Sequence, residues 1–145
     1  MRDWLLLQAL GRYGDFGLLA MRTTIGAFLV WGVWDNITDA TAMNSFVLFL
    51  KNFQFPNPEL LARVSVAVQF VVGLGFVLGL FTRWAGIFCA VNFGVALAMV
   101  DRLAGMRAAF PSICLIVIGG YLALRGAGFY GIDTWLERRG QDRER

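Results

Sequence analysis

The sequence predicts an all-α membrane protein in which four transmembrane helices form an antiparallel up-and-down bundle. Of its 145 residues, 58% are hydrophobic and only 16% are charged, a balance outside that of soluble domains of this size. The mean hydropathy is +0.63, and apolar segments long enough to cross a bilayer recur four times. These observations exclude a soluble ligand-binding module.

Each predicted span has about the 17 to 25 residues that a helix needs to cross a bilayer. The third is the most uniformly apolar, because Asn92 is its one strongly polar side chain. The first carries Arg22 in mid-run and lacks a small-residue cleavage site after it, which favours a retained helix over a signal peptide. The spans are expected at residues 16–34, 60–81, 84–100 and 108–124.

The links between the spans set their order in space. Only Thr82 and Arg83 separate the second span from the third, and about seven residues separate the third from the fourth, so these are antiparallel neighbours. Eight Lys and Arg residues fall on the side of the two chain ends and four on the other side. By the positive-inside rule, we expect both termini in the cytoplasm.

Two further helices are expected outside the spans. The outer loop, residues 36–59, has apolar residues at helical spacing and predicts a short interfacial helix: Met43, Phe46, Val47, Leu50 and Phe53. Residues 132–139, with Asp133 near their start, predict a short cytoplasmic helix. We therefore expect one membrane domain over residues 1–139, followed by a charged cytoplasmic tail at 140–145.

Small residues recur at four-residue spacing in the second and third spans, where they let helix backbones approach closely in lipid. We interpret them as helix-packing positions rather than as a site. They are Gly75, Gly79, Gly86, Ala90, Gly94 and Ala98.

Two amides lie deep in the predicted membrane region. Gln69 and Asn92 are each nine residues from the outer end of their span, which places both at a depth of about 13 Å. They could hydrogen-bond each other as structural glue, or line a polar pocket that opens outward between the first three spans. Residues above this level would form its rim and frame: Asp35, Asp101, Trp31 and Trp34.

Arg22 lies about two turns into the first span from the cytoplasmic side. Its side chain could snorkel towards the headgroups or pair with Asp15. Alternatively it could bind an anionic ligand or a quinone headgroup. The three interpretations stay open at this stage.

The residue inventory limits the chemistry. The chain has no His, which removes imidazole-ligated haem and the commonest metal ligand. Cys89 and Cys114 lie within apolar runs, so we predict no metal site, no catalytic residue and no intrinsic cofactor. The net charge of +3 comes from basic residues spread between the spans, which argues against a nucleic-acid partner.

Several features occur in a characteristic order. Arg22 and Gly26 are followed by the string Trp-Gly-Val-Trp-Asp-Asn at 31–36, then by Gly-Leu-Phe-Thr-Arg at 79–83, Asn92-Phe93 and Arg-Gly-Ala-Gly at 125–128. In this order they resemble the DoxX family of small bacterial membrane proteins, over about residues 18–139. The resemblance implies a four-helix protein of the bacterial inner membrane.

The resemblance also implies a setting. Members of the family are linked to quinone-coupled oxidation of sulfur compounds and to membrane assemblies that handle thiols or oxidative stress. This chain departs from the family pattern at two positions: Gln69 stands where members often have a carboxylate, and Asp101 where many have a His. Because a neutral amide does not exchange a proton at ordinary pH, an inherited proton-coupled mechanism is weakened.

Three hypotheses follow. The first is an accessory or anchor subunit of a redox-linked membrane assembly, partnered by an oxidoreductase. The second is a quinone-linked oxidoreductase component that holds quinone, as a possible cofactor, at the level of Gln69 and Asn92. The third is a small-molecule carrier, for which a homo-oligomer would have to supply symmetry.

Overall fold

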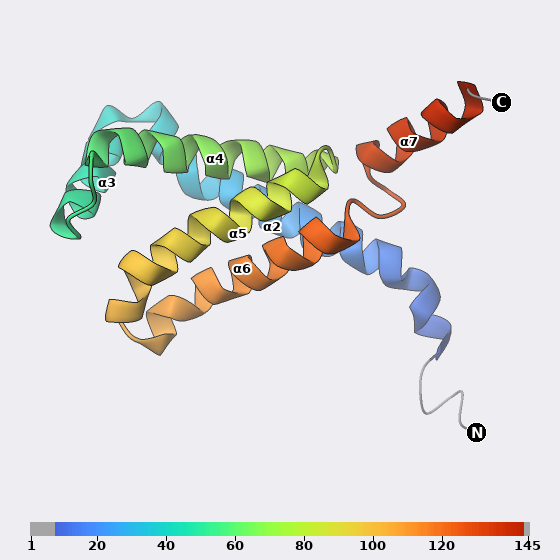
Figure 1. Ribbon diagram of the computed structural model, residues 1–145, viewed down its shortest axis with the longest axis horizontal. Helices are drawn as coiled ribbons and strands as arrows, with labels where there is room; N and C mark the ends of the chain where they lie inside the picture. The colour runs from blue at the N-terminus through green and yellow to red at the C-terminus, as the bar shows by residue number, and fades with distance from the viewer. Residues whose placement is uncertain (1–7, 144–145) are drawn as a thin grey trace.

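The computed structural model describes residues 8–143 as helices joined by short turns (Figure 1). In chain order they are η1 (Gln8–Tyr13), α2 (Gly14–Thr38), α3 (Ala40–Asn52), α4 (Pro58–Leu78), α5 (Thr82–Met99), η2 (Asp101–Leu103), α6 (Met106–Arg125) and α7 (Ile132–Arg143). Four segments are long and apolar enough to cross a membrane: Gly11–Thr38, which contains α2, and the helices α4, α5 and α6. The predicted all-α membrane fold with four transmembrane helices is confirmed.

Helices also form at both places outside the spans where we expected them. In the outer loop, α3 begins after Asp39, whose side chain accepts a hydrogen bond of 2.8 Å from the Thr41 backbone N–H. At the other end of the molecule, α7 begins at Ile132 as expected and continues to Arg143. The last two residues of the expected charged tail, 144–145, lie outside the described residues.

The turn between α4 and α5 lies earlier in the chain than the sequence indicated. Gly79 has φ 67 and ends α4, and Phe81 has φ 50 and precedes the first residue of α5. A positive φ is easy for glycine and uncommon for a residue with a side chain. Gly79 therefore caps α4, which differs from the helix-packing position that its spacing predicts.

The four spans are arranged as two closely packed pairs, α2 with α4 and α5 with α6. In the first pair the backbones touch at Gly26 and Gly73, where a Cβ on Gly26 would lie 2.6 Å from the Gly73 carbonyl oxygen. In the second pair a Cβ on Gly86 would overlap the carbonyl oxygen of Gly119. Each pair thus crosses at a point where only glycine fits.

The other expected packing positions differ in their surroundings. A Cβ on Gly75 would lie 3.3 Å from the Ala85 Cβ, so this residue packs within the α4–α5 hairpin. The Ala90 backbone N lies 3.1 Å from where a Cβ on Gly119 would be. Among the described residues, nothing lies within 4 Å of a Cβ built on Gly94, and Ala98 is exposed. The close contact of α5 with α6 therefore belongs to the first half of α5.

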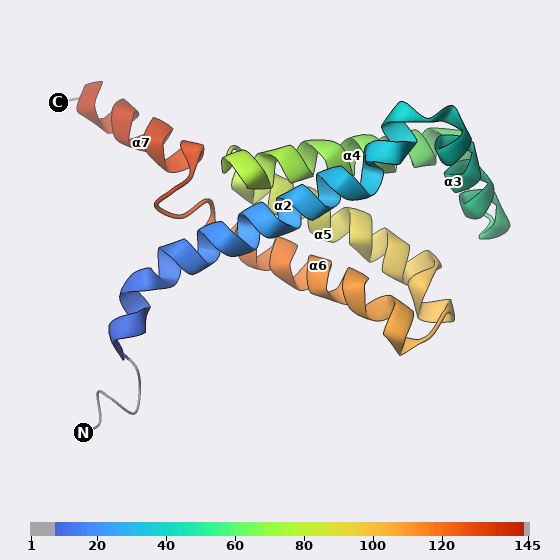
Figure 2. The same ribbon diagram turned by 180° about the vertical axis from the view of Figure 1, so that it is seen from behind.

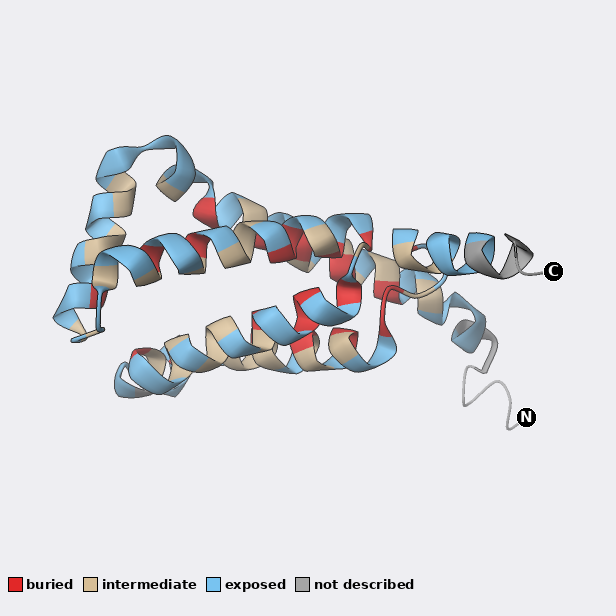
Figure 3. Cartoon of the chain, turned by 45° about the horizontal axis from the view of Figure 1, so that its top comes forward, coloured by how far each residue is buried: buried red, intermediate tan, exposed pale blue. Residues whose placement is uncertain are grey.

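The two pairs meet through α4 and α5 and diverge towards α3, as Figure 3 shows. Buried residues gather where the pairs meet, towards the end of the bundle that carries α7 (Figure 3). Seen from behind, α2 crosses α4 obliquely as it runs from this α7 end to the opposite α3 end (Figure 2). The α4–α5 turn lies at the α7 end and η2 at the α3 end.

Candidate functional site

A cavity of about 700 Å³ lies where the two helix pairs diverge, at the α3 end. Its walls come from α3, α4, α5 and the segment that follows α3. Most of the lining is apolar, including the rings of Phe46, Phe49, Phe88 and Phe93. Ligand pockets commonly have volumes of about 300 to 1,000 Å³ and apolar walls with a few placed polar groups. This cavity has the size and lining of a site for a small apolar molecule.

The polar groups of the cavity form a short hydrogen-bonded chain on its α4 and α5 walls. Gln69 Nε2 donates to Ser65 Oγ at 3.2 Å, and Ser65 Oγ donates to Asn92 Oδ1 at 3.0 Å. The structure therefore brings the two amides together, with the serine hydroxyl between them. Within the described part of the chain, the Gln69 carbonyl oxygen and the Asn92 amide nitrogen make no hydrogen bond, so the Gln69 acceptor and the Asn92 N–H donors remain free.

Ser65 belongs to this candidate site, and the sequence patterns did not predict it. It lies four residues before Gln69, so both side chains stand on the same face of α4. That spacing was a usable signal. A lone serine in an apolar helix usually bonds back to a backbone carbonyl of its own helix, so its residue type alone does not indicate this contact.

Among the described residues that line the cavity, Asp101 in η2 is the ionisable one. Ser112 Oγ in α6 donates a hydrogen bond to the Asp101 carboxylate, and Ser112 is buried. The contact joins the end of α5 to the start of α6. A carboxylate thus lies at the α3-end edge of a mostly apolar cavity.

Asp35 does not join this group. It lies on α2 and is exposed, and it is not among the described residues that line the cavity. Trp31 and Trp34, which we expected to frame the pocket, do not line the cavity. They are 78% and 50% exposed on the outside of the bundle. The reason is that α2 packs against a separate face of α4 through Gly26, and α3 takes the place that we had given to α2.

The DoxX family model matches residues 17–102, which is more than half of the 145-residue chain. The chain belongs to the DoxX family. No curated protein and no solved structure significantly matches this chain. The hydrogen-bonded chain of Ser65, Gln69 and Asn92 lies inside the matched range, as does Asp101, whereas α6 and α7 lie beyond it.

Arg22 of this DoxX protein lies at the α7 end, away from the cavity. Its side chain is 1% exposed, and Nη2 donates to the Tyr130 carbonyl oxygen at 3.2 Å. Among the described residues, its Nε and Nη1 have no hydrogen-bond partner. The structure thus differs from both structural alternatives: the guanidinium is enclosed rather than snorkelling, and Asp15 pairs with Arg125 instead, at 3.4 Å.

Two glycines explain why the DoxX chain can enclose this guanidinium. A Cβ on Gly79 would collide with the Arg22 guanidinium, and one on Gly131 would lie 3.2 Å from Nη1. The nearby negative charge is that of Asp133 in the first turn of α7. Arg22 therefore connects α2 to the α4–α5 turn and to the segment before α7, and it does not belong to the cavity.

Proposed function

We propose that this DoxX protein is a membrane subunit of a redox-linked assembly and that it binds a quinone in the cavity at the α3 end. The observation that carries the proposal is an apolar cavity whose polar groups, at membrane depth, include a free amide donor and a free carbonyl acceptor. A quinone needs this combination of an apolar surround and a few directional hydrogen bonds.

The residues fit a quinone at both of its ends. The Asn92 amide can donate a hydrogen bond to a quinone carbonyl. In the reduced form, the quinol hydroxyls can donate hydrogen bonds to the Gln69 carbonyl oxygen. An isoprenoid tail would lie against the phenylalanine-rich wall. When bound, a quinone supplies the capacity to carry electrons and protons within the membrane. The chain supplies binding and orientation, and Asp101 places a carboxylate near the cavity edge.

The role of a subunit follows from what the sequence offers. The sequence contains no His. Both cysteines lie in membrane-spanning helices, and Cys89 is buried. Electrons would therefore pass between the quinone and a partner oxidoreductase. The excess of Lys and Arg on the α7 side supports placing both termini in the cytoplasm, in a bacterial inner membrane, so that the cavity opens towards the outer face.

Replacing Gln69 by leucine is expected to weaken quinone binding about tenfold, because one hydrogen bond to the ligand is lost and Ser65 loses a partner. The measurement is a titration of purified protein with a short-chain ubiquinone, followed by tryptophan fluorescence. Asn44→Leu makes the same chemical change on the exposed face of α3 and should leave the affinity unchanged. Equal affinities for all three proteins, or no binding by the wild type, would refute the quinone site.

Gentle purification from the native membrane is expected to yield a stoichiometric oxidoreductase partner, identified by mass spectrometry. The accessory role predicts this partner whether or not quinone binds, since α7 and α3 present exposed surfaces on the two sides. A protein that binds quinone but purifies alone under several mild detergents would argue against the subunit role. Ligand flux into proteoliposomes would instead favour the carrier hypothesis.

A further inference from the structure

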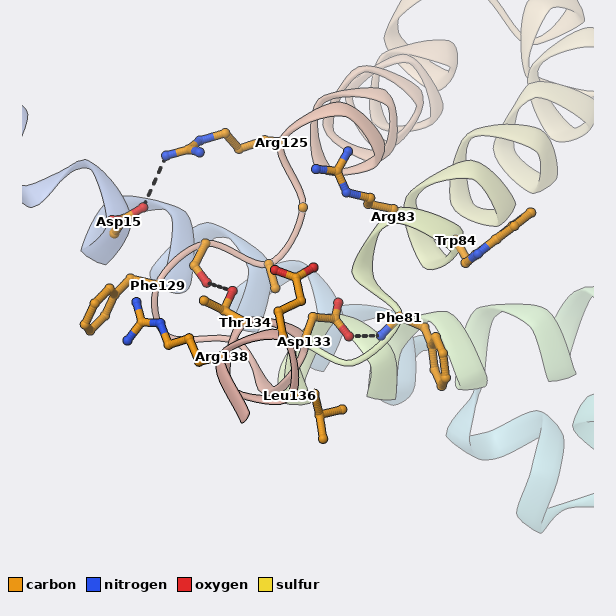
Figure 4. A pocket seen from close by; sticks show the side chains of 14 residues that line it. Asp15, Phe81, Arg83, Trp84, Arg125, Phe129, Asp133, Thr134, Leu136 and Arg138 are labelled. Atoms are coloured by element: carbon orange, nitrogen blue, oxygen red, sulfur yellow. Dashed lines mark hydrogen bonds and ion pairs between the residues drawn. The ribbon is translucent and has the colours of Figure 1, made fainter. Parts of the chain in front are cut away.

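A second hollow, of about 560 Å³, lies at the α7 end of the bundle (Figure 4). It is formed by the start of α5, the end of α6 and the segment that leads into α7. Three guanidinium groups line it, from Arg83, Arg125 and Arg138. It is separate from the quinone cavity, which lies at the opposite end of the same helices.

Each of the three arginines is held by one or two contacts and keeps other donors free. Arg83 Nη1 donates to the Leu124 carbonyl oxygen at 2.9 Å, at the last turn of α6. Arg125 Nη2 lies 3.4 Å from Asp15 Oδ1, and the Arg138 guanidinium stacks 4.4 Å from the Phe129 ring centroid. A guanidinium has five N–H donors, so every one of these groups can still bind an anion.

Three carboxylates, those of Asp15, Asp133 and Glu137, lie in the same lining, so the formal charges of the hollow balance, but most of these carboxylates are engaged elsewhere. Asp133 Oδ1 and Oδ2 accept hydrogen bonds from the Phe81 and Thr82 backbone N–H groups, at 2.7 and 2.8 Å. Its charge is thereby offset by the N-terminus of α5. Asp15 is engaged by Arg125, and Glu137 is the remaining carboxylate of the lining. Among the described residues, the guanidiniums of Arg83 and Arg138 pair with no carboxylate, so these two groups remain available to an anionic ligand.

An apolar groove of about 460 Å³ continues from this hollow along α4 and α5. The two share Phe81 and Trp84, which form part of both linings. Beyond them the groove is walled by aliphatic side chains such as Val71 and Leu74, and by Phe88, whose ring centroid lies 6.4 Å from that of Trp84. A charged hollow thus opens directly into a groove on the membrane-spanning part of the helices.

We propose that the hollow and the groove together bind one glycerophospholipid. Its phosphate diester lies among Arg83, Arg125 and Arg138, and one acyl chain follows the groove past Trp84. Free phosphate has the same chemistry at the guanidiniums, but it would leave the adjoining groove without a role. Tryptophan at the headgroup boundary is a common feature of lipid-facing surfaces. This site does not depend on the proposed quinone function.

The test compares two lipids with the same acyl chains. Delipidated full-length protein in detergent is titrated with dioleoylphosphatidylglycerol and with monogalactosyl dioleoylglycerol, which lacks phosphate, and bound lipid is counted by native mass spectrometry. We expect the phospholipid to bind about tenfold more tightly. In the double variant Arg125→Gln/Arg138→Gln this preference should be lost, while Arg63→Gln/Arg107→Gln, two exposed arginines at the α3 end, should keep it.

A groove variant separates a lipid from free phosphate. Val71 is 66% exposed and lines only the groove, so Val71→Trp can fill the groove without touching the arginines. It should weaken phospholipid binding about tenfold while the melting temperature of the lipid-free protein stays unchanged. Equal binding of the two lipids by the wild type would overturn the proposal. Competition by inorganic phosphate together with unaltered binding by Val71→Trp would overturn the lipid as the occupant.

Discussion

Substitution of Gly86 by valine is expected to force α5 away from α6 and to lower the free energy of unfolding by about 3 kcal/mol. A Cβ at this position would overlap the Gly119 carbonyl oxygen and lie 2.6 Å from the Ala123 backbone N. Both are backbone atoms, which cannot turn aside as a flexible side chain would. The measurement is equilibrium unfolding of the purified protein in mixed micelles, followed by circular dichroism.

The matched control is Gly94→Val on the same helix, eight residues further along. Within the part of the chain that the structure describes, a Cβ there has nothing within 4 Å, so stability should change by less than about 0.5 kcal/mol. If both variants lost stability equally, the cause would be the removal of glycine from α5 in general, and the close crossing at Gly86 and Gly119 would be refuted.

Substitution of Asp133 by alanine is expected to loosen the contact of α7 with the α4–α5 turn and to lower the free energy of unfolding by about 2 kcal/mol. Two backbone N–H groups at the start of α5 lose their acceptor, and Arg22 loses the carboxylate near its guanidinium. Hydrogen–deuterium exchange read by mass spectrometry should show faster exchange in peptides that contain residues 79–84 and 126–133.

Glu137→Ala provides the control, because this carboxylate lies one turn further along α7 and is exposed. It should leave the exchange of both peptides unchanged. Asp133→Asn keeps one side-chain acceptor, so its exchange rates should fall between those of the wild type and Asp133→Ala. Slow exchange at the α4–α5 turn in Asp133→Ala would contradict the capping role of this carboxylate.

Much of the fold could be predicted because a bilayer imposes simple requirements. A spanning helix must be apolar over about 20 residues, so the four spans could be found from hydropathy. The position of the α4–α5 turn was predicted less accurately. Its third residue, Phe81, is apolar, so hydropathy assigns it to a membrane span although it has the positive φ of a turn residue. Hydropathy gives the length of a span more reliably than the residue at which its helix ends.

The candidate site was predictable only in part. Counting residues from the outer ends placed Gln69 and Asn92 at one depth, because the rise of an α-helix is fixed. Which helices face the amides was not predictable, since that depends on the contact of Gly26 with Gly73. No spacing pattern links these two residues, which lie in different spans. The enclosure of Arg22 depends likewise on Gly79 and Gly131, far apart in the chain.

Because the two helix pairs diverge, a small rotation where they are joined produces a larger displacement at their far ends. The pairs are joined near the α7 end, by a three-residue turn and the contact of α4 with α5, while the cavity lies at their far ends. An 18-residue helix such as α5 is about 27 Å long, so a rotation of about 5° at the joint moves its other end by about 2 Å. A small rotation at the joint would therefore change the width of the cavity, and it is at this joint that Asp133 fastens α7 to the α4–α5 turn.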